Sequence, residues 1–538
     1  MPEPRPTVSS LARVHGLRVL AAAGAPAPEE DSPVVTGVTL DSRRVGPGWL
    51  YAALPGSRTH GARFVPDAAR AGAVAVLTDP EGASLADAAL AAADGDGHEH
   101  LPALPLLVDD DPRRALGPLA ADVLGRPSEE LALLGVTGTN GKTTVTTLVD
   151  AVLRGLDVPS GLVGTIRARI RDEVLPSSFT TPEAPDLQAL LRRAADAGCR
   201  AVSSEVSSHA LEQHRVDGTR YAVVGFTNLS RDHLDHHGTM AAYFAAKLRL
   251  FTGGFAPAAV VCTDDPWGEA VARAARDAGL DVVTVGSGDA DVRVHVTGST
   301  DDGRQQVTAT GDVLTGTGGE PLALDLPLPG RFNATNAVLA LVLVDVLLRR
   351  EPAVLDGAAH PGAARLAALL AGADGVPGRM ERVTAPGTPL VVVDYAHTPD
   401  AVAGAVAALR PATRGRLVVV LGAGGDRDPG KRAAMGAAAS AADLVVVTDD
   451  NPRSEEPATI RAAVLAGVTA ASREVGDRAE AVRVALQACD GPADTVLLAG
   501  KGHETGQTVA GATHPFDDRE VAAAALTAWR AEQAGGDA

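Results

Sequence analysis

A glycine-rich segment, GVTGTNGKTT at 135–144, carries the clearest chemical signal in this sequence. It follows an apolar run typical of a strand and precedes a stretch typical of a helix. Glycines let several backbone N–H groups point inward at the start of a helix, which is one way proteins bind phosphate. In such a loop Lys142 would reach the outer phosphates and Thr143 would hold Mg²⁺. The segment therefore predicts a nucleotide-binding site.

The match to the strict P-loop pattern is incomplete, because Val136 stands where that pattern has its first glycine. We therefore expect a variant loop built on Gly138 and Gly141. The alternative is an ordinary junction between a strand and a helix, which the sequence Gly-Lys-Thr in this setting disfavours.

Two further polar segments follow predicted strands and could complete a metal site beside the loop. They are SSEVSSH at 203–209 and TNLSRDHLDHH at 227–237. Glu205 and His233 are the candidate ligands beside Thr143, although Mg²⁺ prefers oxygen and histidine is a minority ligand. The alternative is that the acidic residues around His233 cap a helix. The neighbouring nucleotide loop favours the metal.

Four more polar loops follow four predicted strands in the last third of the chain. They are DYAHTPD at 394–400, GAGGDRD at 422–428, DDNPR at 449–453 and GKGHE at 500–504. In an open parallel sheet, ligands bind outside the carboxyl ends of the strands. Unrelated turns would explain any one loop, but not the concentration of Asp, Arg, His and Glu in all four. We therefore expect one shared binding crevice.

An α/β fold must position these segments. Short runs rich in valine and leucine alternate with glycine-containing loops and alanine-rich helical stretches, which is typical of parallel sheets covered by helices. The predicted strands lie at 131–136, 201–206, 221–227, 258–262, 390–393, 417–421, 444–448 and 495–499. Turn signals at 301–303 and 318–319 predict an antiparallel excursion over 292–328, followed by a buried helix at 336–349. We expect three domains, at 1–110, 111–375 and 376–538.

Composition argues against several classes of function. The 538 residues carry 48 Lys and Arg against 67 Asp and Glu, a net charge of −19. Nucleic acids and anionic membranes need a basic surface, so neither is expected as a partner. Three widely separated cysteines predict no CxxC metal site and no disulfide framework, which fits a reducing cytoplasm. The first seven residues do not resemble a signal peptide, and the apolar run 337–348 is too short to span a bilayer.

Taken together, these motifs resemble the Mur ligase family over nearly the whole chain. The resemblance also rests on LDSR at 40–43, ALPG at 53–56, TTP at 180–182 and GRFNATN at 330–336. It implies three domains: a UDP-binding N-terminal domain, a central P-loop ATPase-like domain and a Rossmann-like C-terminal domain. GTNGKT alone would also suit a folylpolyglutamate synthase, but DNPR together with GKGHE is much more specific.

The resemblance also implies a role for each matching residue. ATP would contact Gly138, Thr139, Asn140, Gly141, Lys142, Thr143, Thr144, Asn333 and Asn336. The UDP-sugar peptide would contact Leu40, Ser42, Ser57, Arg58, Thr59, Thr180, Thr181, Ser207, Gln213 and Arg215. The two asparagines open a predicted helix, where asparagine is also an ordinary cap.

Lys247 is the residue whose interpretation the resemblance changes most. A lone lysine in an amphipathic pattern such as YFAAKLRLF at 243–251 is normally part of a solvated face. In the Mur ligase family the matching lysine reacts with CO₂ and becomes a carbamate anion that helps to hold Mg²⁺. The implied metal ligands are Thr143, Glu205, His233 and the Lys247 carbamate, and the implied catalytic residues are Lys142, Lys247, Glu205 and His233.

The implied reaction adds meso-2,6-diaminopimelate to the D-glutamate γ-carboxylate of UDP-N-acetylmuramoyl-L-alanyl-D-glutamate, through an acyl phosphate, in peptidoglycan precursor synthesis. The amino acid would contact Arg427, Asp450, Asn451, Pro452, Arg453, Gly500 and Glu504. Arg453 offers a planar fork for the far carboxylate of diaminopimelate, and Glu504 can pair with the far ammonium. L-Lysine lacks that carboxylate, and family members that use lysine lack this arginine.

Three alternative functions fit parts of the same pattern. A lysine-adding ligase is disfavoured by Arg453, and a folylpolyglutamate synthase is disfavoured by the LDSR segment at 40–43. A nucleotide-binding scaffold without catalysis would show a broken site, yet Lys142, Glu205 and Lys247 are all present.

The sequence departs from the family pattern at two positions near the expected UDP-sugar contacts. His60 stands where many relatives have Asp, and Phe179 stands where some have a polar residue. The Ala- and Gly-rich loop at 91–100 matches no motif. The cofactor expected is Mg²⁺, with ATP as a substrate, and we expect a cytoplasmic monomer.

Overall fold

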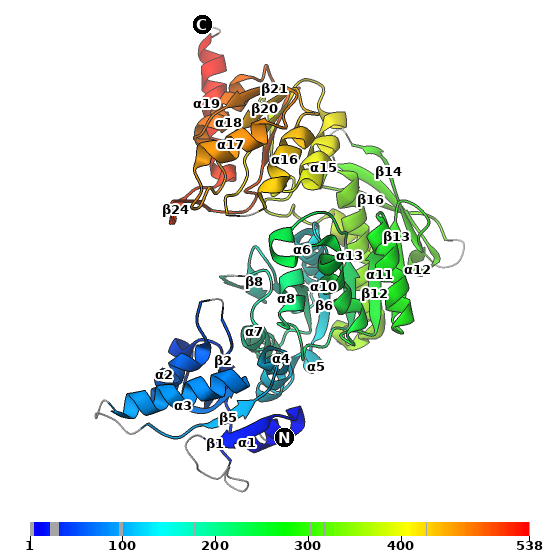
Figure 1. Ribbon diagram of the computed structural model, residues 1–538. Coiled ribbons are helices and arrows are strands. Elements are labelled where there is room, and N and C mark those ends of the chain that lie inside the picture. The colour runs from blue at the N-terminus through cyan, green and yellow to red at the C-terminus, as the bar shows by residue number, and fades with distance from the viewer. Residues whose placement is uncertain are drawn as a thin grey trace.

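The computed structural model describes residues 5–21, 32–56, 58–95, 101–176, 179–300, 304–315, 319–426 and 428–536. Three large sheets, each packed against helices, follow one another from one end of the molecule to the other in chain order (Figure 1). The predicted α/β class is confirmed. Residues 301–303, 318 and 96–100, where turn signals and part of a loop were predicted, lie outside the described residues.

The first sheet has five strands in the order β1-β5-β4-β3-β2. They are β1 (Arg18–Ala21), β2 (Gly37–Thr39), β3 (Trp49–Ala52), β4 (Ala73–Thr78) and β5 (Pro105–Val108). The β1–β5 pair is antiparallel and the other pairs are parallel. Its helices are α1 (Val8–His15), α2 (Val65–Arg70) and α3 (Pro80–Gly95). Helix α4 (Pro112–Val123) packs Leu116 and Leu119 into the same core, and the domain boundary at 110 stays a prediction.

The central sheet has eleven strands in the order β16-β15-β14-β13-β12-β11-β6-β10-β7-β8-β9. They are β6 (Ala132–Thr137), β7 (Ser160–Val163), β8 (Ala168–Ile170), β9 (Glu173–Leu175), β10 (Ala201–Glu205), β11 (Val223–Phe226), β12 (Ala258–Cys262), β13 (Asp281–Gly286), β14 (Val292–Ser299), β15 (Gln305–Thr310) and β16 (Leu322–Leu326). The middle of the sheet is parallel. The predicted antiparallel excursion is confirmed in β14, β15 and β16, and a second antiparallel edge, β8 and β9, was not predicted.

Helices cover both faces of the central sheet because its strands are apolar on both sides. In β6, Leu134 and Val136 belong to one core cluster, whereas Leu133 belongs to the other. The surrounding helices are α6 (Lys142–Gly155), α7 (Ala184–Asp196), α8 (Ser208–Glu212), α9 (Leu234–His237), α10 (Met240–Thr252), α11 (Pro266–Asp277), α13 (Arg331–Arg350) and α14 (Ala363–Ala371). Strand β6 pairs in parallel with both β10 and β11, so the loops after these three strands leave the same edge of the sheet.

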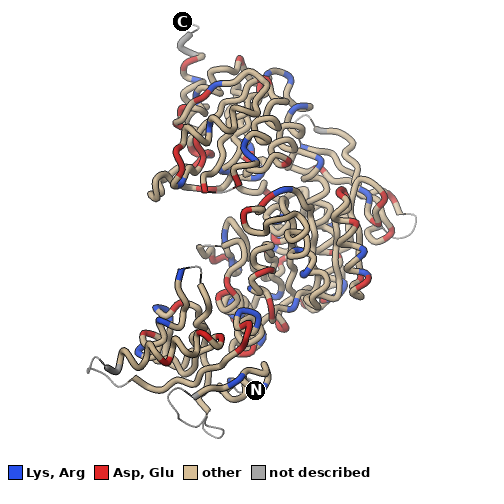
Figure 2. Tube along the Cα trace, viewed as in Figure 1, with Lys and Arg blue, Asp and Glu red and all other residues tan. Residues whose placement is uncertain are grey.

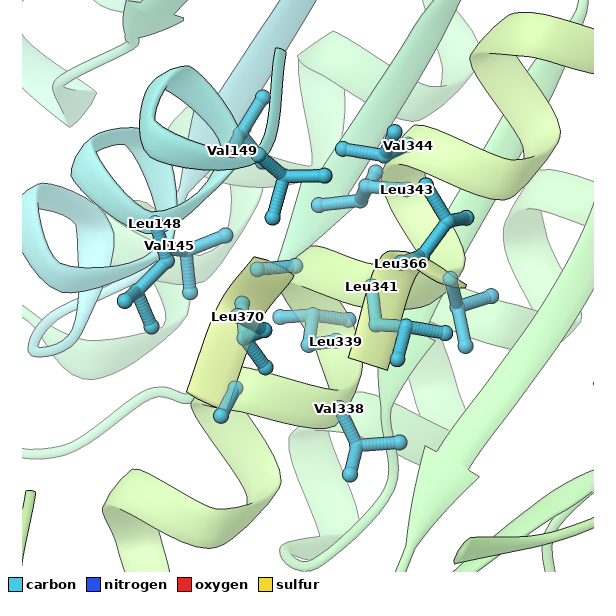
Figure 3. Close-up of a cluster of buried hydrophobic side chains, with 14 of the residues drawn as sticks. Val145, Leu148, Val149, Val338, Leu339, Leu341, Leu343, Val344, Leu366 and Leu370 are labelled. Atoms are coloured by element: carbon cyan, nitrogen blue, oxygen red, sulfur yellow. The ribbon is translucent and has the colours of Figure 1, made fainter. Parts of the chain in front are cut away.

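Helix α13 is the predicted buried helix, and it begins five residues earlier than the sequence pattern suggested. Within the described part of the chain it is the one helix long and apolar enough to cross a membrane, but 83% of its most apolar window is buried. Its leucines and valines pack against α6 and α14 (Figure 3). The buried Asp345 carboxylate accepts a hydrogen bond from Arg349 at 2.7 Å, which compensates for burying its charge.

The third sheet has six strands in the order β17-β18-β22-β19-β20-β21. They are β17 (Glu381–Val383), β18 (Leu390–Asp394), β19 (Leu417–Leu421), β20 (Leu444–Val447), β21 (Ala471–Glu474) and β22 (Thr495–Ala499). Only β17 pairs antiparallel among these described strands. The helices are α15 (Pro399–Leu409), α16 (Arg432–Ala439), α17 (Pro457–Leu465), α18 (Arg478–Gln487) and α19 (Asp518–Gly536), and a hairpin of β23 (Gly506–Val509) and β24 (Ala512–Pro515) follows β22.

The charged residues are distributed over all three parts of the molecule. In the view of Figure 2, Lys and Arg are interspersed with Asp and Glu in all three parts and do not gather into one stripe. Binding of an anionic ligand must therefore depend on local groups, because the net charge of −19 opposes it.

Candidate active site

The loop between β6 and α6 has the geometry of a phosphate-binding loop. Gly138 and Gly141 have φ angles of +152° and +86°, conformations that favour glycine. A side chain at Gly138 would collide with the Thr227 hydroxyl, and one at Gly141 would lie 2.7 Å from Oδ1 of Asn336. Lys142 is the first residue of α6, and its Nζ donates to the carbonyl oxygens of Gly138 and Thr139, both at 2.9 Å. Burial lowers the pKa of Lys142.

Three oxygen-bearing side chains meet behind this loop. The Thr143 hydroxyl donates to Glu205 Oε2 at 3.0 Å, and the Thr165 backbone N–H donates to Glu205 Oε1 at 2.8 Å. The Thr165 hydroxyl lies 3.0 Å from Oε2 of the same carboxylate. A cavity of about 10 Å³, lined by Thr143, Gly164 and Glu205 among others, adjoins these groups. A buried carboxylate and a hydroxyl beside a small cavity are hard oxygen donors that fit Mg²⁺.

Lys247 lies in α10 and is almost completely buried, with 1% of its surface exposed. The interpretation as a solvated lysine is therefore wrong for this residue. Its Nζ donates to the carbonyl oxygen of Gly138 at 2.7 Å and lies 4.5 Å from the centre of the Tyr243 ring. Burial and the nearby Lys142 hold the pKa of the Lys247 amine well below its usual value. A lowered pKa increases the share of the neutral amine, and only the neutral amine is nucleophilic.

The segment after β11 contacts the C-terminal domain through Asp232. The Asp232 carboxylate lies 3.4 Å from Nζ of Lys431 and 3.6 Å from Nε2 of His397. The neighbouring His397 and Lys431 lower the pKa of the Asp232 carboxyl, despite its burial. His233 precedes α9 in a left-handed conformation and makes no side-chain capping bond. Burial lowers the pKa of His233 to about 3, so its ring is neutral.

A pocket of 390 Å³ lies between the central and C-terminal domains. Asn333 and Asn336, from the first turns of α13, line it together with Asn140 and Gly141 of the glycine loop. Gly330 occupies the N-cap position of α13, so neither asparagine is its cap. The opposite wall comes from the C-terminal domain and includes Tyr395 and Arg379.

The predicted peptide-binding residues of the central domain lie together beside Glu205. The Thr181 hydroxyl donates to the Glu205 carbonyl oxygen at 2.9 Å and accepts from the Ser207 N–H at 3.0 Å. Arg215 donates to Oε1 of Gln213 at 2.7 Å and to the Thr181 carbonyl oxygen at 3.1 Å. The Thr180 hydroxyl accepts from Thr165 at 3.0 Å.

The departure at Phe179 has a structural counterpart in this group. The Phe179 ring is 55% exposed, and the Arg215 guanidinium lies over it at 5.1 Å. An aromatic ring at this position therefore supports the arginine that is expected to bind an acidic peptide.

The predicted UDP-binding residues that the structure describes follow strands of the first sheet. Leu40 and Ser42 directly follow β2, and Arg58 and Thr59 lie in the loop after β3. Ser57 lies outside the described residues. His60, the second departure from the family pattern, accepts from the Ala62 N–H at 3.0 Å and lies 3.2 Å from Asp79.

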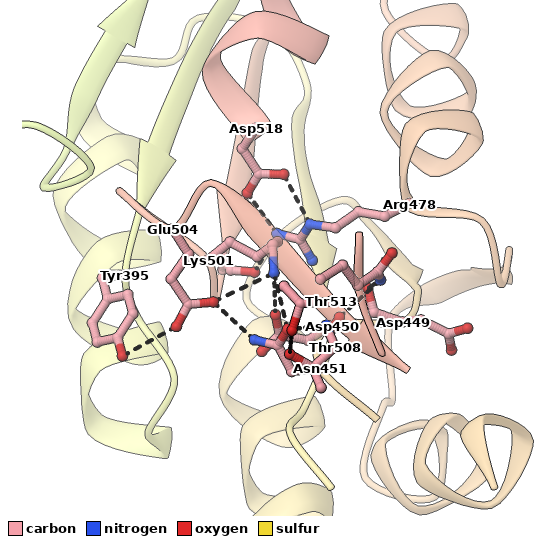
Figure 4. Close-up of polar contacts among 12 residues, drawn as sticks. Tyr395, Asp449, Asp450, Asn451, Arg478, Lys501, Glu504, Thr508, Thr513 and Asp518 are labelled. Carbon is pink, nitrogen blue, oxygen red and sulfur yellow. Dashed lines mark hydrogen bonds and ion pairs between the residues drawn. The ribbon is translucent and has the colours of Figure 1, made fainter. Parts of the chain in front are cut away.

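The predicted amino-acid site surrounds a buried lysine that the sequence pattern did not single out (Figure 4). Nζ of Lys501 lies 3.4–3.5 Å from Asp450 Oδ1, Asn451 Oδ1 and Glu504 Oε2. Nδ2 of Asn451 also donates to Glu504 Oε2 at 2.8 Å. Lys501 therefore holds two carboxylates and an amide in one cluster. Arg427 lies outside the described residues.

Arg453 and Gly500 flank this cluster. Arg453 has a left-handed backbone (φ +54°) and donates from one guanidinium nitrogen to the Gly425 carbonyl oxygen at 2.7 Å. It follows Pro452, and its N–H donates to the Thr508 carbonyl oxygen of β23 at 3.0 Å. Gly500 has a φ of +116°, where a larger residue would be strained.

A buried ion pair fastens the last helix to this site. Arg478 of α18 and Asp518 of α19 are fully buried and 2.7 Å apart, and Arg478 also donates to the Ala499 carbonyl oxygen at 3.0 Å (Figure 4). Ala499 directly precedes Gly500, so this pair fixes the end of β22 from which the site loop begins.

Arg379, Tyr395 and Lys431 were likewise missed as site residues. Arg379 donates to the Thr143 hydroxyl at 3.2 Å from the other domain. The available signal was weak: Tyr395 lies in a polar segment and Lys431 lies just after one, but the partner of each of the three residues is more than a hundred positions away in the chain.

Comparison with known proteins gives consistent matches along the chain. Models of three Mur ligase units match: the Mur ligase family, catalytic domain, at 34–123; the Mur ligase middle domain at 136–344; and the Mur ligase, glutamate ligase domain, at 378–502. A UDP-N-acetylmuramoyl-L-alanyl-D-glutamate--2,6-diaminopimelate ligase of Streptomyces avermitilis is 46% identical, with 93% of each chain covered. One of Corynebacterium efficiens is 45% identical, covering 97% of this chain and 94% of the relative.

A solved structure agrees with these matches. The structure of a UDP-N-acetylmuramoyl-L-alanyl-D-glutamate--2,6-diaminopimelate ligase aligns with a TM-score of 0.62 and 31% identity. The alignment covers 94% of this chain and 98% of that one.

Proposed function

Because the chain belongs to the Mur ligase family, we propose that it joins meso-2,6-diaminopimelate to the D-glutamate γ-carboxylate of UDP-N-acetylmuramoyl-L-alanyl-D-glutamate. The reaction is an ATP-dependent ligation in peptidoglycan precursor synthesis. The observation that carries this proposal is the cluster of Asp450, Asn451 and Glu504 around Lys501, on the C-terminal domain that also walls the nucleotide pocket.

The first step activates the carboxylate, whose negative charge repels nucleophiles. An oxygen of the γ-carboxylate attacks the γ-phosphorus of ATP, which forms an acyl phosphate and releases ADP. The loop from Gly138 to Thr144 holds the phosphates at the start of α6, and Asn333 and Asn336 line the pocket for the adenosine. Lys142 exchanges its two carbonyl partners for phosphate oxygens and stabilises the charge that develops during transfer.

Thr143, Glu205 and His233, together with a Lys247 carbamate, would hold Mg²⁺ in this site. When bound, Mg²⁺ supplies positive charge to the phosphoryl group during transfer. The neutral Lys247 amine adds to CO₂, forming an N–C bond and losing one proton, and the product is a carbamate anion. This modification replaces a buried base by an oxygen donor beside Gly138.

The second step forms the amide. The free amine of diaminopimelate attacks the acyl carbon, and the tetrahedral intermediate expels phosphate and loses a proton. Asp232 holds the two domains together through Lys431 and His397, which keeps water away from the acyl phosphate.

The two substrates are positioned by separate groups. Arg215, beside Thr180, Thr181, Ser207 and Gln213, binds the acidic peptide, while Leu40, Ser42, Arg58 and Thr59 face the uridine end. In the C-terminal site, the remaining guanidinium N–H groups of Arg453 take the far carboxylate of diaminopimelate. Glu504 pairs with the far ammonium, while Lys501 balances the charge of the two carboxylates around it.

The decisive experiment measures phosphate release and tripeptide formation by the purified protein with ATP, Mg²⁺ and the UDP-muramoyl-dipeptide. Phosphate release should require meso-diaminopimelate, and mass spectrometry should find the tripeptide product. Omission of each substrate in turn is the control. Equal turnover with L-lysine would refute the specificity for diaminopimelate. Absence of product with both amino acids would refute the ligase assignment.

We also propose that the protein acts in the cytoplasm as a monomer. One chain supplies every residue assigned above to the three substrates. Light scattering at assay concentrations should therefore give the mass of one chain, 54.5 kDa, and a dimer would contradict this part.

A further inference from the structure

Three imidazoles gather in the central domain, and none of them has a role in the reaction proposed above. His209 lies in α8, and His236 and His237 end α9. One ligand atom from each lies within 4.8 Å of the others. The centres of the rings of His209 and His236 are 4.2 Å apart, and those of His236 and His237 are 4.8 Å apart.

A carboxylate completes this group. Glu212 lies three residues after His209 in the same helix, so both side chains emerge on one face. Oε2 of Glu212 is 2.7 Å from Nε2 of His236 and 3.2 Å from Nδ1 of His237. Three imidazoles therefore lie close together, and the Glu212 carboxylate contacts two of them.

The orientation of these ligands is already set by their other contacts. Nε2 of His237 lies 2.9 Å from the Ser208 hydroxyl, which leaves its Nδ1 directed at Glu212. A hydrogen bond at the second ring nitrogen is the usual support of a metal-binding histidine.

We infer that His209, Glu212, His236 and His237 form a binding site for one divalent transition-metal ion of the zinc class. Imidazole suits Zn²⁺, and three nitrogens with one carboxylate match its preference for four ligands. Mg²⁺ prefers an all-oxygen shell, so this site is chemically distinct from the one at Thr143 and Glu205. His236 and Glu212 are exposed, which gives an ion access from solvent.

The position of the site places it behind the nucleotide loop. The ring of His209 packs edge-on against His233 with 4.8 Å between centres. The ring of His237 lies 5.0 Å from that of Tyr243, whose hydroxyl is 3.1 Å from the Thr139 hydroxyl. A bound ion would therefore restrain residues that adjoin the phosphates.

The test is titration of the full-length protein with Co²⁺, which reports its coordination by visible absorption. Excess Mg²⁺ is present to occupy oxygen-rich sites. One equivalent of Co²⁺ should give the spectrum of a four-coordinate ion, and Zn²⁺ should abolish it by displacement. The variants His236→Gln and Glu212→Gln should each weaken binding by about tenfold or more. His295→Gln, at an exposed histidine of β14, is the matched control and should bind as the native protein does.

Circular dichroism of each variant serves as the check that it is folded. Absence of the four-coordinate spectrum in native protein would overturn the inference, as would equal cobalt binding by both site variants. A spectrum that is lost in Glu205→Gln but kept in His236→Gln would assign the ion to the magnesium site and would also overturn it. None of these results depends on ligase activity.

Discussion

The hydroxyl of Tyr395 donates to Oε1 of Glu504 at 3.5 Å, which joins the nucleotide pocket to the proposed amino-acid site. The Arg379 guanidinium lies 4.5 Å above the same ring and donates to the Thr143 hydroxyl. A continuous series of contacts thus runs from the phosphate-binding loop to the carboxylate expected to hold diaminopimelate. The proposed sites for ATP and for diaminopimelate therefore lie at the two ends of this series.

Tyr395→Phe should raise the KM for diaminopimelate and leave the KM for ATP unchanged. The variant keeps the ring that lines the nucleotide pocket but loses one hydrogen bond to Glu504, which corresponds to about a 2- to 12-fold effect. Steady-state phosphate release with each substrate varied in turn is the measurement. Tyr221→Phe, buried in the central core, is the matched control. A comparable rise in the KM for ATP would contradict the assignment of the hydroxyl.

Arg453→Gln should lower kcat/KM for meso-diaminopimelate by about 10- to 150-fold, the range for losing a charged hydrogen bond. Residual turnover of L-lysine should stay the same, because lysine has no far carboxylate for the arginine to bind. The comparison of both amino acids in one assay separates recognition from damage to the fold. Arg473→Gln, at an exposed position of β21, is the control. Equal losses with both amino acids would rule out a role in selecting the far carboxylate.

The proposed carbamate on Lys247 should be visible directly. Protein equilibrated with ¹³C-labelled bicarbonate should show one slowly exchanging carbamate signal by NMR, because burial lowers the pKa of the Lys247 amine and shields its product from solvent. Lys247→Ala should lack this signal and lose most ligase activity, and added CO₂ should not restore it. Native activity in Lys247→Ala would eliminate the carbamate from the mechanism.

Gly138→Ala should abolish ATP binding while the protein remains folded. The added methyl group would collide with the Thr227 hydroxyl, and the loop would have to move away from the phosphate-binding conformation. Calorimetric titration with ATP is the measurement. Gly288→Ala is the matched control, because a methyl group added there would meet no described atom within 4 Å and its backbone is not left-handed. Equal ATP affinity in the two variants would refute the role of Gly138.

His503→Gln should make the stability of the protein less sensitive to acid. Burial lowers the pKa of His503 to about 4, so the folded state binds a proton less readily than the unfolded state, whose histidine titrates near 6.5. Folding stability is therefore lost as the pH falls from about 6.5 to about 4, and this contribution is constant above that window.

Urea unfolding of both proteins at pH 7 and pH 4.5 checks this expectation. The variant should gain up to about 3 kcal/mol relative to the native protein at the lower pH. His514→Gln, at an exposed histidine of β24, should track the native protein. An equal difference in the free energy of unfolding between variant and native protein at both pH values would show that His503 does not titrate in this way.

The parts of the site that sequence could predict are those encoded by neighbouring residues. The glycine loop is recognisable because strand, glycines, lysine and helix follow one another within fifteen positions. Lys247 has no such local signal: its surroundings in α10 are typical of a solvated helix, and its burial arises because the glycine loop folds over it. Only resemblance to a family assigned it a role.

The residues that were missed act across domains or inside a cluster. Arg379 reaches Thr143 and Lys431 reaches Asp232, pairs that form only once the C-terminal domain packs on the central one. Lys501 lies in the GKGHE motif, but two of its three acceptors, Asp450 and Asn451, lie in a loop about fifty residues earlier in the chain. Spacing along the chain carries no signal for such contacts.

The ion pair between Arg478 and Asp518 has a consequence for the order in which the enzyme is made. Arg478 and the loop after Ala499 are synthesised before Asp518, which lies in the last helix. Until that helix emerges, a fully buried arginine lacks its carboxylate, a state that costs several kcal/mol. The amino-acid site is thus completed on the ribosome later than the nucleotide loop, which precedes it in the chain. A nascent chain can acquire its nucleotide loop early, but selection of diaminopimelate has to wait for Asp518.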